Sequence, residues 1–316
     1  MALIDRIHDS GGYRRDVLEK DYYVCLVLEE LSIMQKAGLP AYFKGGTALY
    51  KALKTTRRFS EDIDLSVDGR DCSRTQNDKR LAGAVKKYTS LVRNPEEGKT
   101  NRSEVISVYH YEPLVAYDSD DVLQRFGKLK VEATSFTISE PVEELEIAPI
   151  LYEQSSSIFR DILSERYAVR PFSVLTISME RIFIDKLFAA ESYVRKSDDL
   201  HRAFEAAKHI YDLAVLYEDL RIRQLTGDEK QMKYLLGIRM EEEMGRLDGI
   251  PGVLPSEFIL FWGAAENRNV QQAYEIMQKQ YVFRESDRIP YEEAARRLKK
   301  LGELLNNNPV WYGKRS

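Results

Sequence analysis

The sequence predicts an α+β protein: a mixed, twisted sheet flanked by helices, followed by a helical C-terminal domain. Three observations lead to this fold class. Short segments between residues 41 and 138 alternate polar and apolar residues, as half-buried strands do. From Val174 onward, apolar residues repeat at helical spacing. The chain has 316 residues, 43% of them hydrophobic, which is enough to bury a continuous core.

The strands and helices are expected in the following order. Residues 16–38 carry apolar side chains at helical spacing and stop at Gly38 before Pro40. AYFKGGT predicts a short strand and a tight turn, and Thr47 is a suitable N-cap for the helix that follows. The further predicted strands are DIDLSV, EVISVYHYEPLV and KLKVEATSFTI. Residues 69–103 are polar and predict an insertion around one helix-like segment, AGAVKKYTSLV.

The second half is predicted to be helical. Its periodic segments are TISMERIFIDKLFAAESYVR, LHRAFEAAKHIYDLAVLYEDL, EKQMKYLLGIRMEEEM and PYEEAARRLKKLGELL. Glycine and proline make residues 248–256 the clearest loop. We therefore expect an N-terminal helical segment (1–36), a sheet-containing core (37–150) and a helical C-terminal domain (151–316).

Composition restricts the classes of function. A net charge of −4 argues against non-specific adhesion to nucleic acid over the whole surface, so such contact must be local. Basic residues are candidates for a local patch, among them Lys51, Lys54, Arg57, Arg58, Arg181 and Arg195. The two cysteines and four histidines show no zinc or disulfide spacing. We find no membrane span or signal peptide, and we expect a cytoplasmic protein.

The most informative feature is a Gly-Gly turn followed by an acidic strand. Asp62 and Asp64 are two positions apart on a strand, so their carboxylates share one face while Ile63 faces the core. Adjacent carboxylates repel, and Mg²⁺ bound by carboxylates and substrate phosphates is the usual resolution, with Mn²⁺ as an alternative ion. Gly45 and Gly46 lack a Cβ, so a phosphate can approach their N–H groups.

These residue types point to nucleotidyl transfer from an NTP. A hydroxyl would attack the α-phosphorus in line, a metal ion would clamp the attacking and leaving oxygens, and pyrophosphate would depart. Glu132 lies at a polar position of the strand KLKVEATSF and is a candidate base or third metal ligand. A P-loop kinase is excluded, because no Lys-Ser or Lys-Thr follows the glycines at the required spacing.

Simpler interpretations stand beside this one. An isolated Asp-x-Asp pair is most often a solvated strand edge, but the glycine turn before it argues otherwise. Ser60 fits an ordinary turn as well as a phosphate contact. Arg57 and Arg58 have the character of surface charges, although arginine suits phosphate well.

The motifs resemble those of a known family. GGTAL followed by RRFSEDIDL resembles the first motif of the AbiEii/AbiGii nucleotidyltransferases, toxins of bacterial toxin–antitoxin and phage abortive-infection systems that include the MenT toxins. LEKDYYV (18–24) is similar to the family's N-terminal Glu-Lys-Asp signature, and IDKLFA and KHIYDLAVL resemble two later motifs. The family belongs to the DNA polymerase β superfamily. Sixteen positions separate Gly46 from Asp62, a long spacing typical of the toxin branch.

The resemblance implies a nucleotidyltransferase core at residues 37–150 and a set of site residues. It implies metal binding at Asp62 and Asp64, and catalytic roles for these two residues, Lys186 and Asp212. Candidate contacts to the NTP phosphates are Gly45, Gly46, Thr47, Ser60 and Arg58. The family's usual Arg-Asp before the motif's tyrosine is replaced here by His209-Ile210.

Lys186 and Asp212 also stand out from the residues alone. Lys186 shares a helical face with Ile182, Phe183 and Ala190. On such an apolar face, the ammonium group needs an anionic partner, or the side chain must extend until the ammonium group reaches the solvent. Asp212 lies on an apolar-rich helix, and pairing with Lys186 across a helical hairpin is one interpretation. The Glu-Lys-Asp triplet at residues 19–21 has two interpretations, solvation of the first helix or shaping of the nucleotide site.

We therefore expect a toxin that transfers nucleotides from an NTP to an RNA acceptor, with a tRNA 3′ end favoured by the MenT resemblance and a cognate antitoxin as partner. Two alternatives remain open. The same site could add a nucleotide to a protein hydroxyl, or the chain could bind an NTP or a partner without turnover. The nature of the labelled acceptor separates the three.

Overall fold

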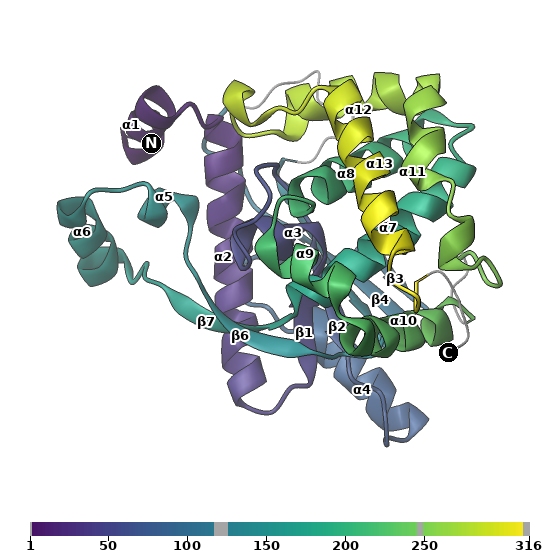
Figure 1. Cartoon of the computed structure of the whole chain (residues 1–316). Coiled ribbons are helices and arrows are strands. Elements are labelled where there is room, and N and C mark those ends of the chain that lie inside the picture. Colours follow the sequence, from purple (N-terminus) through teal and green to yellow (C-terminus); the bar gives the residue numbers. More distant parts are fainter. Residues whose placement is uncertain (1, 117–125, 245–248, 312–316) are drawn as a thin grey trace. The chain divides into compact units, whose positions relative to one another are not determined.

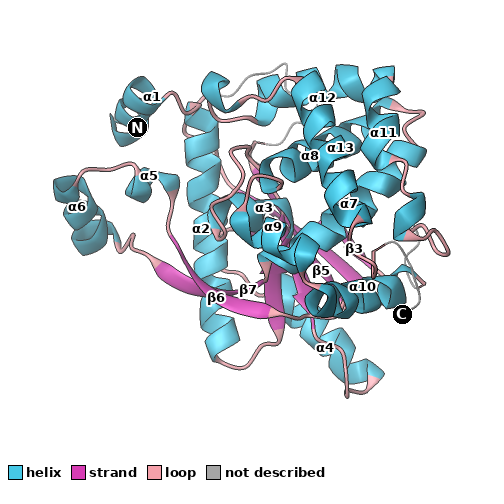
Figure 2. Cartoon of the chain, viewed as in Figure 1, coloured by secondary structure: helices cyan, strands magenta, loops and turns pink. Residues whose placement is uncertain are grey.

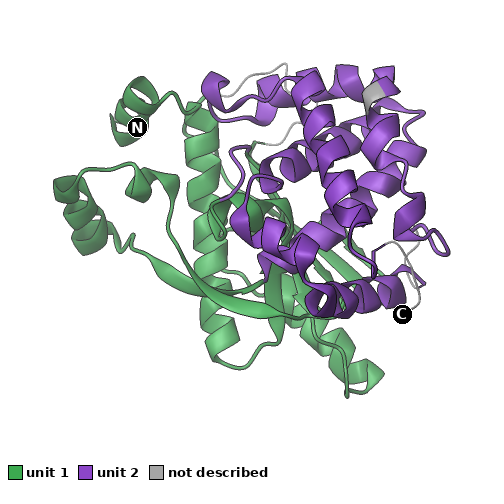
Figure 3. Ribbon diagram, viewed as in Figure 1, with its two compact units in different colours: residues 1–54, 59–177 green, residues 55–58, 178–316 purple. Residues whose placement is uncertain are grey.

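The computed structural model describes residues 2–116, 126–244 and 249–311. The chain divides into two compact units. The first contains residues 1–54 and 59–177, and the second contains residues 55–58 and 178–316 (Figure 3). Each unit has its own buried core. No helix within the described ranges combines the length and the apolar content needed to cross a membrane.

The first unit is built on a mixed seven-stranded sheet that is open at both edges (Figure 2). Its strands, in chain order, are β1 (Ala41–Lys44), β2 (Ile63–Val67), β3 (Val92–Thr100), β4 (Glu104–His110), β5 (Lys128–Thr134), β6 (Val142–Ile147) and β7 (Phe172–Ile177). The spatial order is β3-β4-β5-β2-β1-β7-β6. Strand β2 runs antiparallel to β1 and parallel to β5, and β1 runs parallel to β7. The predicted mixed sheet is confirmed.

The first unit also contains helices, of which the second, third and fourth in chain order contact this sheet. Their bounds are α1 (Ala2–Gly11), α2 (Arg15–Lys36), α3 (Gly45–Lys51), α4 (Arg74–Val85), α5 (Ile150–Glu153) and α6 (Ser157–Tyr167) (Figure 1). Gln35 of α2 donates to the carbonyl of Leu175 in β7 at 3.0 Å and accepts from its N–H at 2.9 Å. Tyr109 of β4 donates to the carbonyl of Val85 in α4 at 2.6 Å. The predicted first helix is confirmed, since α2 ends just before Gly38.

The polar insertion differs in detail from its prediction. The expected helix AGAVKKYTSLV covers residues 82–92, but α4 begins earlier because Ser73 and Gln76 form a reciprocal capping box at its N-terminus. After α4 the chain enters β3, a strand that the sequence did not predict. Most of the β3 side chains are exposed or half-buried, so no alternating pattern marked it.

Strand β7 extends the first unit to Ile177. It pairs antiparallel with β6 and so belongs to the same sheet as the core. The sequence-based boundary lies between residues 150 and 151, whereas the compact units divide at 177/178. Hydrogen bonds between strands distant in the chain account for the difference.

The second unit is helical in its described residues. Its elements are α7 (Met179–Arg195), α8 (Leu200–Leu216), α9 (Leu220–Gly227), α10 (Glu229–Glu243), η1 (Pro255–Glu257), α11 (Leu260–Gly263), η2 (Ala264–Glu266), α12 (Arg268–Tyr281), η3 (Glu285–Asp287) and α13 (Tyr291–Asn306). Helix α8 packs against α7, α12 and α13. Ser178 and Asp199 cap the N-termini of α7 and α8. Of the predicted loop, residue 248 lies outside the described residues, 249–254 are irregular and 255–257 form η1.

Candidate active site

The glycine turn lies directly against the acidic strand. Gly45 begins α3 with φ +81°, a left-handed conformation that L side chains rarely adopt. A Cβ at Gly45 would overlap the Oδ2 atom of Asp64. The structure therefore brings together the two features that the sequence predicted to cooperate, and it requires glycine at this position. Gly46 follows as the second residue of α3.

Thr47 connects the same turn to Asp62, but not as predicted. It lies inside α3, and the N-cap of this helix is Lys44, so the predicted N-cap role of Thr47 is wrong. Its buried hydroxyl donates instead to the main-chain carbonyl of Asp62. This bond ties α3 to the residue that precedes β2. A phosphate contact by Thr47 stays a prediction.

Strand pairing collects the acidic residues on one polar surface. Asp64 is in register with Glu132 of β5 on one side and with Lys44 of β1 on the other. On β2, Ile63 and Leu65 are fully buried, as expected for strand alternation. The polar side of β5 carries Lys130 and Glu132, whereas its other side is buried. Glu132 thus reaches the neighbourhood of Asp64, as the sequence suggested.

Two lysines accompany the carboxylates. The Nζ atom of Lys130 lies 2.8 Å from Oδ2 of Asp62 and 3.5 Å from Oε2 of Glu132. Lys44 donates to the hydroxyl of Thr134 at 3.0 Å. Sequence reasoning missed both lysines. Lys130 precedes Glu132 by two positions on a strand, and this spacing was the available signal that the two share a face.

The electrostatics of the cluster indicate an excess of negative charge around Asp64. Burial raises the pKa of Asp64 first, and the neighbouring carboxylate of Glu132 adds to it, so that the pKa reaches about 6 despite Lys130 and Lys44. Although its own burial acts in the opposite direction, Asp62 and Glu132 raise the pKa of Lys130 above its ordinary value. An additional cation would relieve the repulsion.

This donor set fits a magnesium site completed by substrate. Among the described residues, no group of three or more His, Cys, Asp or Glu side chains is arranged to hold a metal ion alone. Mg²⁺ needs fewer protein ligands, because it is commonly bound by one or two carboxylates with phosphates and water. The contact of Asp62 with the Lys130 ammonium shows that a cation is accommodated there. Asp62 and Asp64 are the residues that would hold the ion, and Glu132 as a third ligand stays a prediction.

The Glu-Lys-Asp triplet supports this region from α2. All three side chains are buried, so the interpretation that they solvate the first helix is wrong. Asp21 pairs with Lys51 of α3 at 2.6 Å and accepts from the N–H of Ile150 at 2.6 Å. Glu19 accepts from the N–H of Leu114 at 2.7 Å.

Lys20, the middle residue of the triplet, lies near the acidic strand. Its Nζ atom is 3.7 Å from Oε2 of Glu61, the residue before Asp62. The triplet therefore anchors α3 and the approach to β2 on the same helix. Ser60, a predicted phosphate contact, precedes Glu61 and is half-buried outside any helix or strand. Its phosphate role stays a prediction.

The remaining predicted site residues lie in the second unit. Asp212 is fully buried and forms an ion pair with Lys186 at 2.6 Å, as the hairpin interpretation predicted. Arg58 binds the same carboxylate with two donors, Nε at 2.7 Å and Nη2 at 2.6 Å. Arg58 is buried, so its interpretation as a surface charge is wrong, while Arg57 is exposed. Functional roles for Arg58, Lys186 and Asp212 stay predictions.

The cations around Asp212 determine its ionisation. Burial alone would raise the pKa of Asp212, but Arg58 and Lys186 lower it to about 2. His209, one turn earlier on α8, stacks on Tyr193 with ring centroids 5.6 Å apart. Burial, followed by the charge of Lys186, holds the pKa of His209 well below its ordinary value.

The predicted basic patch is wrong for three of its six members, which are buried, whereas Lys54, Arg57 and Arg195 are exposed. Lys51, Arg58 and Arg181 are buried in ion pairs, the last with Glu242 at 2.6 Å. Lys54 is exposed but pairs with Glu153 at 3.0 Å. The three buried positive charges are therefore neutralised inside the units.

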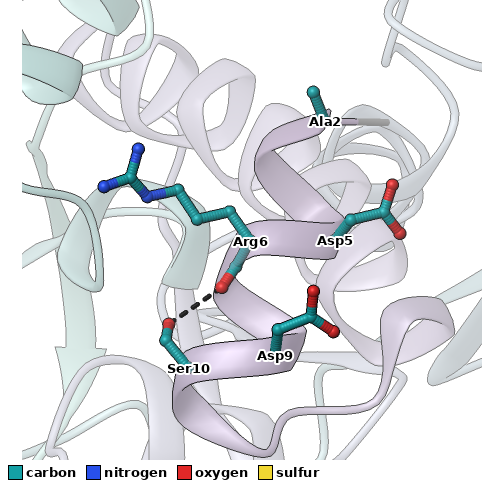
Figure 4. A pocket seen from close by; sticks show the side chains of 5 residues that line it. All are labelled: Ala2, Asp5, Arg6, Asp9 and Ser10. Carbon is teal, nitrogen blue, oxygen red and sulfur yellow. Dashed lines mark hydrogen bonds between the residues drawn. The ribbon is translucent and has the colours of Figure 1, made fainter.

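A surface hollow on α1 lacks the glycine turn and the buried acidic residue of the candidate site. Figure 4 shows it lined by Asp5, Arg6, Asp9, Ser10 and Ala2, all from one helix. The carboxylates of Asp5 and Asp9 both lie near Arg15, at 2.6 and 3.6 Å. It offers neither a glycine turn nor a buried acidic group, so we do not assign it to the chemistry.

Comparison with known proteins agrees with the class that the turn and the acidic strand define. The model of the family described as nucleotidyl transferase AbiEii toxin, type IV toxin–antitoxin system, matches residues 28–298. The chain therefore belongs to the AbiEii family of nucleotidyltransferase toxins. Membership implies a nucleotide substrate and an antitoxin partner.

More distant comparisons add little. A search of curated protein sequences found no match. The chain is similar to the crystal structure of JHP933 from Helicobacter pylori, with 16% sequence identity and a TM-score of 0.43 over 93% of this chain and 94% of that one. At this level of similarity, we base no argument on it.

Proposed function

We propose that this toxin transfers nucleotides from an NTP to an RNA acceptor and releases pyrophosphate, with a tRNA 3′ end as the favoured acceptor. The observation that carries the chemistry is the contact between Gly45 and Asp64, where the turn leaves no space for a side chain. This contact places backbone N–H groups suited to phosphate beside carboxylates suited to a metal ion. Family membership supports nucleotidyl transfer as the reaction class.

The residues would act mainly by positioning and by charge. Bound Mg²⁺ would supply charge neutralisation for the transferring phosphoryl group. Asp62 and Asp64 would hold the ion, and Gly45 and Gly46 would let the triphosphate approach the backbone. Thr47 keeps the turn and the acidic strand in fixed positions through its bond to Asp62. Little covalent chemistry by the protein is required, as is general for phosphoryl transfer.

Lys186 and Asp212 are included as catalytic residues because of the family motifs, and Ser60 and Arg58 as phosphate contacts. For Arg58, Lys186 and Asp212, the structural alternative is a buried ion cluster that stabilises the second unit. The two roles are separable by experiment, because a purely structural cluster affects stability without a specific effect on the transfer step.

The test uses the full chain, Mg²⁺ and each α-³²P-labelled NTP separately, incubated with total bacterial RNA and resolved on a denaturing gel. We expect label in a tRNA-sized band with the wild type and none with Asp62→Ala. The matched control is Asp78→Ala, which removes an exposed carboxylate on α4. Label on protein would indicate protein nucleotidylation instead. NTP binding without any labelled product would indicate a non-catalytic binding module.

A further inference from the structure

Lys130 occupies a position among the carboxylates that the proposed reaction needs for its metal ion. Its ammonium group contacts Asp62 at 2.8 Å and Glu132 at 3.5 Å. Asp64 is in register with Glu132, so the three acidic residues gather beside one cation. Nothing in the sequence motifs or in the family description assigns a role to this lysine.

We propose that Lys130 is an internal counter-cation of the metal site, and that a divalent ion must displace its ammonium group from Asp62 in order to bind. The inference rests on the proposed function for the identity of the metal ligands. It does not depend on which acceptor receives the nucleotide.

The argument begins with the repulsion among the carboxylates. Like charges this close destabilise one another, and a cation within hydrogen-bond distance offsets the repulsion. The Lys130 side chain is half-exposed, and its ammonium group lies at the end of a flexible four-carbon chain. The ammonium group can therefore move away from Asp62 without rearrangement of the backbone. Lys44 is differently placed, because its Nζ atom donates to Thr134.

The position of Lys130 has opposite effects on the stability of the metal-free protein and on its affinity for metal. Lys130 stabilises the protein without metal, because it offsets the acidic charge. It also weakens metal binding, because the ion gains Asp62 only when the ammonium contact is broken. Removal of the lysine charge should therefore tighten metal binding and destabilise the metal-free protein, a combination that a merely structural lysine would not produce.

A matched control lies two residues away on the same face of the same strand. Lys128 is also half-exposed and forms an ion pair, but its partner is Glu97, at 2.9 Å. Lys128→Met removes the same charge from the same strand without touching the carboxylates of the site. Lys130→Arg keeps the charge in place and serves as a second control.

The experiment measures Mn²⁺ binding to the full chain by electron paramagnetic resonance of the free ion, without nucleotide or RNA. We expect Lys130→Met to lower the Mn²⁺ dissociation constant at least about tenfold, since one unit of positive charge at contact distance is lost. Lys128→Met and Lys130→Arg should bind like the wild type. Adding Asp64→Asn to Lys130→Met should abolish the gain, which would place the ion at this site.

Thermal unfolding supplies an independent readout. Without Mn²⁺, Lys130→Met should melt below the wild type, and saturating Mn²⁺ should raise its Tm more than it raises that of the wild type. If Lys130→Met does not fold, Lys130→Gln replaces it with the same expected gain. Unchanged or weaker Mn²⁺ binding, including no detectable binding by either protein, would overturn the proposal.

The outcome is distinguishable from failure of the proposed function. A gain in Mn²⁺ affinity in a protein that transfers no nucleotide supports the role of Lys130 and rejects the transferase reaction. Unchanged affinity in a chain that labels RNA overturns the role of Lys130 alone.

Discussion

The two charged clusters of this protein solve opposite electrostatic problems. In the second unit, fully buried Asp212 is matched by two cations, Arg58 and Lys186, which lower its pKa to about 2. In the first unit, burial raises the pKa of Asp64 and the neighbouring carboxylate of Glu132 raises it further, to about 6. The first of these clusters surrounds one buried carboxylate with two cations, whereas the Asp64 cluster gathers three carboxylates.

This difference in charge distribution distinguishes a binding site from a stabilising ion pair. A buried pair with complete hydrogen bonds needs no ligand, and breaking it leaves an uncompensated charge in the interior. A half-exposed group of like charges is costly until a ligand neutralises it. The family resemblance led us to predict roles for both clusters, and the gathering of carboxylates supports ligand binding at the Asp64 cluster.

The largest expected effect is the loss of transfer activity in Asp64→Asn. The variant keeps the size of the side chain but removes the charge that we propose binds the metal ion. We expect kcat/KM for nucleotide transfer to fall at least about 10⁴-fold, or about 5 kcal/mol in the barrier. Its thermal stability should not fall, because a repelling charge is removed. Wild-type rates in this variant would remove Asp64 from the catalytic site, and Asp78→Asn is the control.

Substitution of Asp212 should mainly affect stability. Asp212→Asn leaves Arg58 and Lys186 buried beside a neutral amide, and we expect a loss of about 3–5 kcal/mol in the free energy of unfolding. Lys186→Met should cost less, because Arg58 still pairs with the aspartate. Urea denaturation measures both losses, and equal losses would contradict the idea that Asp212 is the shared partner.

Transfer assays on Lys186→Met then sharpen the comparison. The catalytic assignment predicts loss of transfer under conditions where the variant is fully folded. If the folded variant transfers nucleotides at the wild-type rate, the cluster is structural and Lys186 leaves the list of catalytic residues.

Gly45→Ala tests the contact between the turn and the acidic strand. The new methyl group would overlap Asp64 in addition to straining a residue at positive φ, and we expect a loss of about 2–3 kcal/mol in stability. Gly12→Ala is the matched control, because Gly12 has φ +69° and nothing within 4 Å of its hypothetical Cβ. It should lose only about 1 kcal/mol. Equal losses, measured by urea denaturation, would show that the contact with Asp64 is unimportant.

The smallest expected effect is the pH dependence that Asp64 contributes in metal-free buffer. Its pKa is about 6 in the folded protein and near the ordinary 3.8 in the unfolded chain, so between these values the folded state holds the proton more tightly. Its contribution to stability is complete below pH 3.8 and is lost as pH rises through about 6. We expect this loss to be about 1–2 kcal/mol relative to Asp64→Asn.

Asp212 should contribute with the opposite sign. Its folded pKa of about 2 lies below the ordinary value, so its contribution is present above pH 3.8 and is lost as pH falls toward 2. The contribution of Asp64 is isolated by comparing the unfolding free energies of the wild type and Asp64→Asn from pH 4 to 7. A difference that does not vary with pH would contradict the raised pKa.

Local pattern was sufficient to find the acidic strand, the glycine turn and the main helices. Strand alternation placed Asp62 and Asp64 on one polar face because side chains two apart point the same way. Helical periodicity found α2 and, in the second unit, α7, α8, α10 and α13, but the periodic segments did not include α12. It also identified Lys186 as a charge in need of a partner, and Asp212 is that partner. These features depend on residues near one another in the chain.

Contacts between distant segments decided the rest. Whether the Glu-Lys-Asp triplet was solvated or buried depended on Lys51 and the backbone of Ile150, which no local pattern connects to α2. Strand β3 had no periodic signal, and β7 joined the sheet through partners far away in the sequence. The position of Lys130 beside Asp62 came from the parallel pairing of β2 with β5. The sequence by itself determined which residue types carry charge, and only the tertiary structure decided which charges are neutralised, because charge balance depends on distance in space.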